Sequence, residues 1–187
     1  SLDHPFRQEL ISSLENLGHE LTGLYSRRQF KDRYQSDLSQ RHTDASYAAA
    51  VFTIDDLDKI SEKLGHDVAQ KIIRSLGSYI NKHFGAVGGF SSRQTINDYA
   101  TVLPYSNLEE SQRIMEDFTK DFNKHGIQGV KTYIEGEDKP EDSVEFSVLA
   151  GLAQGKPQIE IESVMEFARF NQKELARFTC ARGGEAQ

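Results

Sequence analysis

Hydrophobic residues recur every three or four positions along much of the chain, which is the spacing of amphipathic helices. The pattern predicts helices over 6–24, 26–41, 55–64, 67–84, 107–124 and 160–178. The first carries a stripe from Phe6 to Leu24, which either packs on its own domain or forms a signalling stalk or dimer seam. Ser106 or Asn107 is expected to cap the helix at 107–124. In the last helix the residues expected to face inward are Val164, Phe167, Ala168 and Leu175.

Other hydrophobic runs lack the helical period and predict strands. The near-continuous apolar run at 47–54 is typical of a strand that is buried on both faces. Two strands at 90–95 and 98–104 are expected to form a hairpin that turns at Ile96 and Asn97. Strands at 130–135 and 144–153 enclose an acidic loop. Together these elements predict an α/β sandwich with a central mixed β-sheet of about five strands flanked by helices.

Composition narrows the class of partner. The formal net charge of −7 argues against a surface for nucleic acid or for an anionic membrane, because both would be repelled. A single cysteine, Cys180, excludes an intramolecular disulfide and favours a cytoplasmic location. The sequence has no run of the ~18 apolar residues that a membrane span needs, so no membrane contact is expected. The chain begins at Ser1 without a methionine, and we expect it to be a piece of a longer protein.

Four ordered blocks of sequence carry a resemblance to a known family. Residues 21–30 read LTGLYSRRQF and residues 52–66 read FTIDDLDKISEKLGH. Residues 93–104 read RQTINDYATVLP, and residues 147–153 read SVLAGLA. In this order the blocks resemble those of GGDEF domains, the family of the diguanylate cyclases. The resemblance implies the GGDEF, nucleotide-cyclase-like fold and a phosphoryl-transfer chemistry in which two GTP molecules, bound with Mg²⁺ in a dimer, form cyclic di-GMP.

The chain departs from the family at the signature itself. The five signature positions fall on Thr95, Ile96, Asn97, Asp98 and Tyr99. Two glycines that would let the backbone approach a nucleotide are therefore replaced by residues that carry a Cβ atom, and Ile96 suits no turn that needs a positive φ. The resemblance places the two metal-binding acids on Thr53 and Asn97, which are both neutral, so the anionic ligands that Mg²⁺ prefers are lost.

Other positions at which the family has binding residues also hold residues of different chemistry in this chain. In the second block the lysine of the family falls on Asp58, which would repel phosphate, and the two guanine-reading residues fall on Ser61 and Gln70. The phosphate-contacting lysine of the last helix falls near Ala176, with Lys173 and Arg177 one turn to either side. The product-inhibition motif would fall on Ala86, Val87, Gly88 and Gly89, where its charged residues are absent.

A few residues keep a potential for chemistry. Asp55 and Asp98 are candidates for a shifted metal site, although an acid at 55 or 56 is also a common helix cap. Ser61, Lys63 and Gly65 are weak candidates for contacts to a nucleotide. His66 fits a cap or packing role better than that of a catalytic base.

These observations predict a degenerate GGDEF domain at 21–180, preceded by a helical extension or stalk at 1–20 and followed by a loose tail at 181–187. Its expected role is that of a non-catalytic regulatory or dimerisation module in a bacterial signalling protein, without Mg²⁺ or GTP as cofactors. The partners implied by the resemblance are sensory or EAL-type domains of the same chain, and a second copy in a homodimer. Two alternatives stay open: a GTP-binding allosteric domain that controls a neighbouring domain, and a cyclase with a rearranged metal site.

Overall fold

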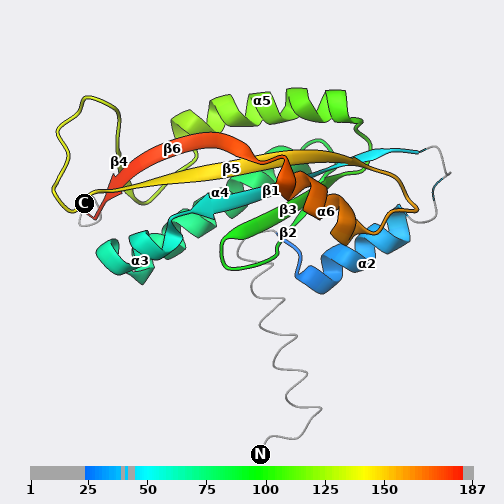
Figure 1. Cartoon of the computed structure of the whole chain (residues 1–187), viewed down its shortest axis with the longest axis horizontal. Helices are drawn as coiled ribbons and strands as arrows, with labels where there is room; N and C mark the ends of the chain where they lie inside the picture. Colours follow the sequence, from blue (N-terminus) through cyan, green and yellow to red (C-terminus); the bar gives the residue numbers. More distant parts are fainter. Residues whose placement is uncertain (1–23, 39–40, 42–44, 183–187) are drawn as a thin grey trace, which may run out of the picture.

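The computed structural model describes residues 24–38, 41 and 45–182, and its elements alternate between helices and strands (Figure 1). The predicted helix at 6–24, all but its last residue, and the tail beyond residue 182 lie outside the described residues. In chain order the elements are α2 (Arg27–Asp37), β1 (Tyr47–Asp55), α3 (Leu57–Leu64), α4 (His66–Gly85), β2 (Phe90–Arg93), β3 (Asp98–Leu103), α5 (Leu108–His125), β4 (Lys131–Tyr133), β5 (Val144–Gly155), α6 (Ile161–Phe170) and β6 (Lys173–Ala181).

The strands form one sheet of six in the order β2-β3-β1-β5-β6-β4, and every neighbouring pair of named strands is antiparallel. The predicted α/β sandwich is confirmed, and its sheet has six strands where about five were expected. The expected mixed orientation is wrong, because all the pairs of named strands are antiparallel. The antiparallel pairing of β1 with β3 follows from the β2–β3 hairpin. This hairpin reverses the chain after the two helices that follow β1, so that β3 runs opposite to β1.

β1 is buried on both faces, as its apolar run predicts, and its alternate residues belong to two separate cores. Ala48, Ala50, Phe52 and Ile54 pack with residues of α3, α4 and α5. Tyr47, Ala49 and Val51 pack with residues of α2 and α6. Figure 1 shows α5 along one side of the sheet, away from α2 and α6. The period of two along a strand therefore divides the helices into two layers.

Side-chain caps fix the starts of α2 and α5. Asn107 caps α5, because its side-chain oxygen accepts a hydrogen bond from the backbone N–H of Glu110 at 2.8 Å. Ser26 and Gln29 form a reciprocal capping box at the start of α2. The predicted cap of α3 by an acid is wrong, since Asp56 takes a left-handed conformation (φ 66°) and its side chain accepts no capping hydrogen bond.

The helix predicted over 160–178 is wrong beyond its first half, because α6 ends at Phe170 and the chain continues as strand β6. The end of α6 packs tightly on Gly151 of β5. A Cβ atom at that position would lie 1.9 Å from the carbonyl oxygen of Ala168 and 2.8 Å from the backbone nitrogen of Gln172. Phe167, which was expected to face inward, is 61% exposed.

No helix within the described residues is long and apolar enough to cross a membrane.

The core beneath α4 and α5 is built from aromatic rings around Phe118, which is fully buried. Its ring centroid lies 5.1 Å from that of Phe84 and 5.4 Å from those of Phe52 and Phe122. The ring thus links β1, α4 and α5.

Replacing Phe118 with alanine is expected to lower the free energy of unfolding by about 3–5 kcal/mol, because the cavity would sit among closely packed rings. Phe170 is 89% exposed and provides a matched control, for which Phe170→Ala should change the free energy by less than about 0.5 kcal/mol. Urea unfolding followed by circular dichroism measures both. Equal effects of the two variants would contradict the central place given to Phe118.

Candidate functional site

The segment at 95–99, to which the resemblance assigns the family signature, lies where the end of β1 meets the β2–β3 turn, and Asp98 is the focus of its hydrogen bonds. Thr53 on β1 is the cross-strand partner of Asp98 on β3. The Thr53 hydroxyl donates to Oδ1 of Asp98 at 2.6 Å, and the Thr95 hydroxyl donates to Oδ2 at 2.9 Å. Both carboxylate oxygens of Asp98 therefore accept a hydrogen bond from a neutral side chain of the same chain.

A residue from the end of α6 extends this network. Nε2 of Gln172 donates to the Thr53 hydroxyl at 2.8 Å and to the backbone oxygen of Val51 at 3.2 Å. Gln172 was missed in the sequence because a helix was expected there. A signal was present nonetheless: after the inward-facing Ala168, a continuing helix needs an apolar residue at 171 or 172, and these are Asn171 and Gln172.

The turn itself is fixed by contacts to backbone atoms. Arg93 donates from Nε to the Thr95 oxygen at 3.1 Å and from a terminal nitrogen to the Ile96 oxygen at 2.7 Å. The side-chain amide of Asn97 donates to the Ile54 oxygen at 3.2 Å, while the Ile54 N–H donates to the Asn97 oxygen. Ile96 is 67% exposed at the tip. The hydrogen bonds of Arg93 and Asn97 therefore stabilise the backbone conformation of the hairpin turn.

Tyr99, the aromatic position of the signature, is part of the core. Its hydroxyl donates to the backbone oxygen of Ile73 on α4 at 2.7 Å, and burial raises the pKa of Tyr99 to about 12. A Cβ atom at Gly77 would lie 2.9 Å from this hydroxyl, so the small residue at 77 makes room for the ring. Tyr99 therefore joins the hairpin to α4 and is not available to a ligand.

Asp55 lies in a different environment from Asp98. It is exposed and lines a cleft of about 390 Å³ between α3 and β5, together with Asp56, Lys59, Lys63 and Arg177. Asp98 does not line this cleft. Within residues 24–38, 41 and 45–182, no three side chains of the His, Cys, Asp or Glu type come close enough to hold a metal ion.

Acids neutralise part of the positive charge in this cleft. Arg177 contacts Glu174 at 2.9 Å, and this hydrogen bond holds the pKa of Arg177 above its usual value. Glu174 also accepts from the Ser147 hydroxyl at 2.8 Å, which lowers the pKa of Glu174 together with Arg177. Ala176, the position near which the resemblance places the family's phosphate-contacting lysine, is buried in β6, so the expected placement of this position on the last helix is wrong.

The weak nucleotide candidates around α3 have local partners. Oγ of Ser61 lies 2.6 Å from Nδ1 of His66, while Lys63 is exposed beside the cleft. Gly65 has a φ of 99°, and a Cβ atom there would lie 2.5 Å from the Arg182 guanidinium. Arg182 hydrogen-bonds the Leu64 oxygen at the end of α3. The requirement for glycine at 65 is therefore structural.

Comparison with known proteins places the chain in a family. The family model described as "Diguanylate cyclase, GGDEF domain" matches residues 19–170, so the chain belongs to the GGDEF family. The diguanylate cyclase DgcP of Pseudomonas aeruginosa is 26% identical over 97 residues, which make up 51% of this chain and 14% of that relative. This chain thus corresponds to a small part of the length of DgcP.

Solved structures agree in fold. The GGDEF domain of DgcB from Caulobacter crescentus, in complex with c-di-GMP, matches with a TM-score of 0.62 at 21% identity, over 80% of this chain and 81% of that chain. The diguanylate cyclase SiaD in complex with its activator SiaC, from Pseudomonas aeruginosa, matches with a TM-score of 0.60 at 17% identity, over 89% of this chain and 63% of that chain.

The family normally uses Mg²⁺ and GTP, and the residues at the signature do not fit the metal. A divalent magnesium ion needs oxygen ligands with negative charge, usually one or two carboxylates beside the phosphates. Here the signature presents only one carboxylate, that of Asp98, and both its oxygens already accept hydroxyl donors. Thr53 and Asn97 add no charge. An ion at Asp98 would compete with the hydrogen bonds from Thr53 and Thr95.

Thr53→Val is expected to lower the free energy of unfolding by about 1 kcal/mol, because Asp98 and Gln172 each lose a partner while the strand keeps a β-branched residue. Thr132→Val on β4 is the matched control and should be neutral within about 0.5 kcal/mol. Chemical denaturation of the two variants tests this. If Thr53→Val is as neutral as the control, the hydrogen-bonded network contributes nothing to stability.

Proposed function

We propose that this chain is a GGDEF-family domain that does not make cyclic di-GMP and acts as a regulatory or dimerising module of a bacterial signalling protein. The observation that carries the proposal is the hydrogen-bonded state of Asp98, whose two oxygens are held by Thr53 and Thr95. The remaining acid at this end of β1, Asp55, faces a separate cleft. The structure therefore gives no support for a metal ion bound by the carboxylates of both Asp55 and Asp98.

The nature of the hairpin tip supports the same proposal. Thr95 and Ile96 occupy the positions where the family has glycines, and each carries a side chain at the surface of the turn. The side chains of Arg93 and Asn97 donate hydrogen bonds to backbone oxygens there, so the conformation of the tip is stabilised by its own residues. A nucleotide that needs a close approach to the backbone would meet these side chains.

We assign the module to residues 21–180 together with Ala181, which completes β6, and Arg182, which binds the end of α3, and we assign 1–20 to an extension through which a neighbouring domain communicates. The tail proposed at 181–187 is thereby corrected at its first two residues. The family match runs over residues 19–170. SiaD was solved with an activator protein, which illustrates how a domain of this fold can work with a partner. For this chain we propose partner domains of sensory or EAL type, and a cytoplasmic location.

The direct test is a search for product after incubation of the purified chain with GTP and either Mg²⁺ or Mn²⁺. We expect GTP to stay intact and neither cyclic di-GMP nor pyrophosphate to appear by chromatography. DgcP, a diguanylate cyclase by name, is the positive control under the same conditions. Product above the level of a protein-free sample would overturn the proposal, and Asp55→Asn and Asp98→Asn would then identify the acid responsible.

The cleft between α3 and β5 favours a second candidate function, the binding of GTP without turnover. Lys59, Lys63 and Arg177 line this cleft and provide positive charge for phosphate groups. Ser61 and the backbone at 56–58 would complete the contacts. In this role the domain would be an allosteric sensor that controls a neighbouring domain.

Isothermal titration with GTP and Mg²⁺ separates the two candidates. The allosteric alternative predicts measurable heat, which the double variant Lys59→Ala, Lys63→Ala should reduce by roughly tenfold or more in affinity, because two charge-assisted contacts are lost. Lys120→Ala, Lys156→Ala removes the same charge from exposed sites outside this cleft and should have no effect. The main proposal predicts no heat for any of these proteins.

A further inference from the structure

A basic groove runs along α4 on the side of the loop that follows α5. The groove has a volume of about 470 Å³, and its lining includes three cationic side chains, Lys71, Arg74 and Lys82, and no carboxylate. These residues follow one face of the helix, and the 11 steps from residue 71 to residue 82 span about 16 Å at 1.5 Å per step. Such a concentration of positive charge is unexpected on a chain whose net charge is −7.

The groove is preformed by contacts between its two walls. Ser75 on α4 donates from its hydroxyl to the Gln128 oxygen at 3.2 Å, and the same hydroxyl accepts from the Gln128 N–H at 3.1 Å. Gly129 takes a positive φ of 78°, and a Cβ atom at this position would lie 3.5 Å from Cδ of Lys71. In the part of the chain that the structure describes, Arg74 and Lys82 take part in no ion pair.

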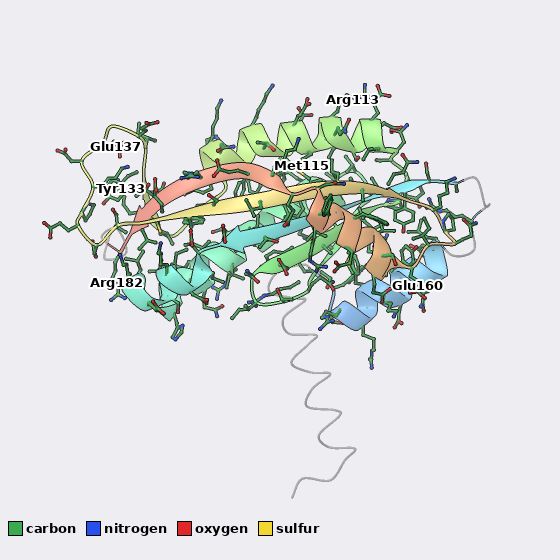
Figure 2. All side chains as sticks on the ribbon, in the orientation of Figure 1. Arg113, Met115, Tyr133, Glu137, Glu160 and Arg182 are labelled. Atoms are coloured by element: carbon green, nitrogen blue, oxygen red, sulfur yellow. The ribbon has the colours of Figure 1, made fainter. Side chains whose placement is uncertain are left out.

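The same chain carries a segment of opposite charge. The loop at 135–142 between β4 and β5 holds five carboxylates and one lysine, and all its residues are exposed. Figure 2 shows Glu137 on this loop, which projects beyond the end of the sheet. None of its carboxylates forms an ion pair with a described residue.

The loop of one copy lines a cleft that is distinct from the groove, although Gly126 lines both. Glu135 and Lys139 of the loop line a cleft with Asn123, Lys124 and Ile127, on the side of α5 and β6. The groove is lined by α4 and by residues 126, 128 and 129. No residue of the loop lines the groove of its own copy, so the carboxylates of the loop are open to the groove of a second molecule.

We infer that the basic groove on α4 receives the acidic loop at 135–142 of a second copy of this chain. Because a two-fold dimer makes the same contact twice, two such pairings would hold one dimer together. Opposite potentials on facing surfaces favour this pairing and disfavour partners of like charge. The inference rests on the dimerising role under the proposed function and names the surfaces that would serve it.

Sedimentation velocity at low and high salt tests the inference without any nucleotide, so its failure is distinct from that of the proposed lack of turnover. At 20 mM NaCl we expect a dimer, and at 500 mM NaCl a monomer, because exposed charge pairs are screened over a few ångströms at high salt. A monomer under both conditions, or a dimer that salt leaves unchanged, would overturn the inference.

Charge reversal identifies the two surfaces. Arg74→Glu, Lys82→Glu reverses the groove, and Glu137→Lys, Glu141→Lys reverses the loop. Each variant alone should raise the dimer dissociation constant by roughly tenfold or more, since like charges then face each other. Arg113→Glu, Lys120→Glu on α5 changes the net charge of the chain as the groove variant does, and Figure 2 shows Arg113 on that helix. This control should dimerise at low salt.

Combining the two charge-reversal variants gives the most discriminating test. A mixture of the groove variant and the loop variant should form a heterodimer, because both of its contacts then join opposite charges. A single chain with both reversals should form a homodimer again. If neither combination restores the dimer, or if the control on α5 loses it equally, the groove and the loop are not partners. Circular dichroism of every variant checks that the fold is retained.

Discussion

The pairing of β1 with β3 on one side and β5 on the other is the interaction on which the rest of the structure depends. The two faces of β1 contribute side chains to the two hydrophobic cores. The helices of each layer therefore pack on alternate residues of this strand. Its register with β3 sets Thr53 opposite Asp98, and its register with β5 sets Asp55 opposite Ser147. The two acids of interest are therefore directed to different neighbours by the sheet itself.

This register explains why the changed signature forms a stable structure. A carboxylate at the end of a buried strand needs compensation, which a bound cation or hydrogen-bond donors can supply. In this chain the hydroxyls of Thr53 and Thr95 supply it, and Gln172 supports Thr53 in turn. The substitutions at these positions form one connected network, so they are consistent with each other as well as with a loss of metal binding.

Much of the fold could be predicted from the sequence because strong local patterns agree with the tertiary structure. The apolar run of β1, the hairpin around Ile96 and Asn97, and the cap at Asn107 were all confirmed. The strand β6 was not predicted, because the apolar positions near Leu175 also fit a helical period. The decisive constraint there is the close contact of Ala168 and Gln172 with Gly151, which is distant in the sequence. The polar pair Asn171 and Gln172 signals only the end of α6, whereas the Gln172–Thr53 hydrogen bond depends on the same distant packing.

The central claim is that the signature of this chain has exchanged a metal site for internal hydrogen bonds. Backbone amide NMR signals during a titration with paramagnetic Mn²⁺, in the presence of GTP, test it most directly. We expect no selective broadening at Thr53, Asn97 and Asp98 compared with exposed acids elsewhere, such as those of the loop at 135–142. Broadening confined to these three residues at low Mn²⁺ concentration would show that a metal ion binds there, and would contradict the claim.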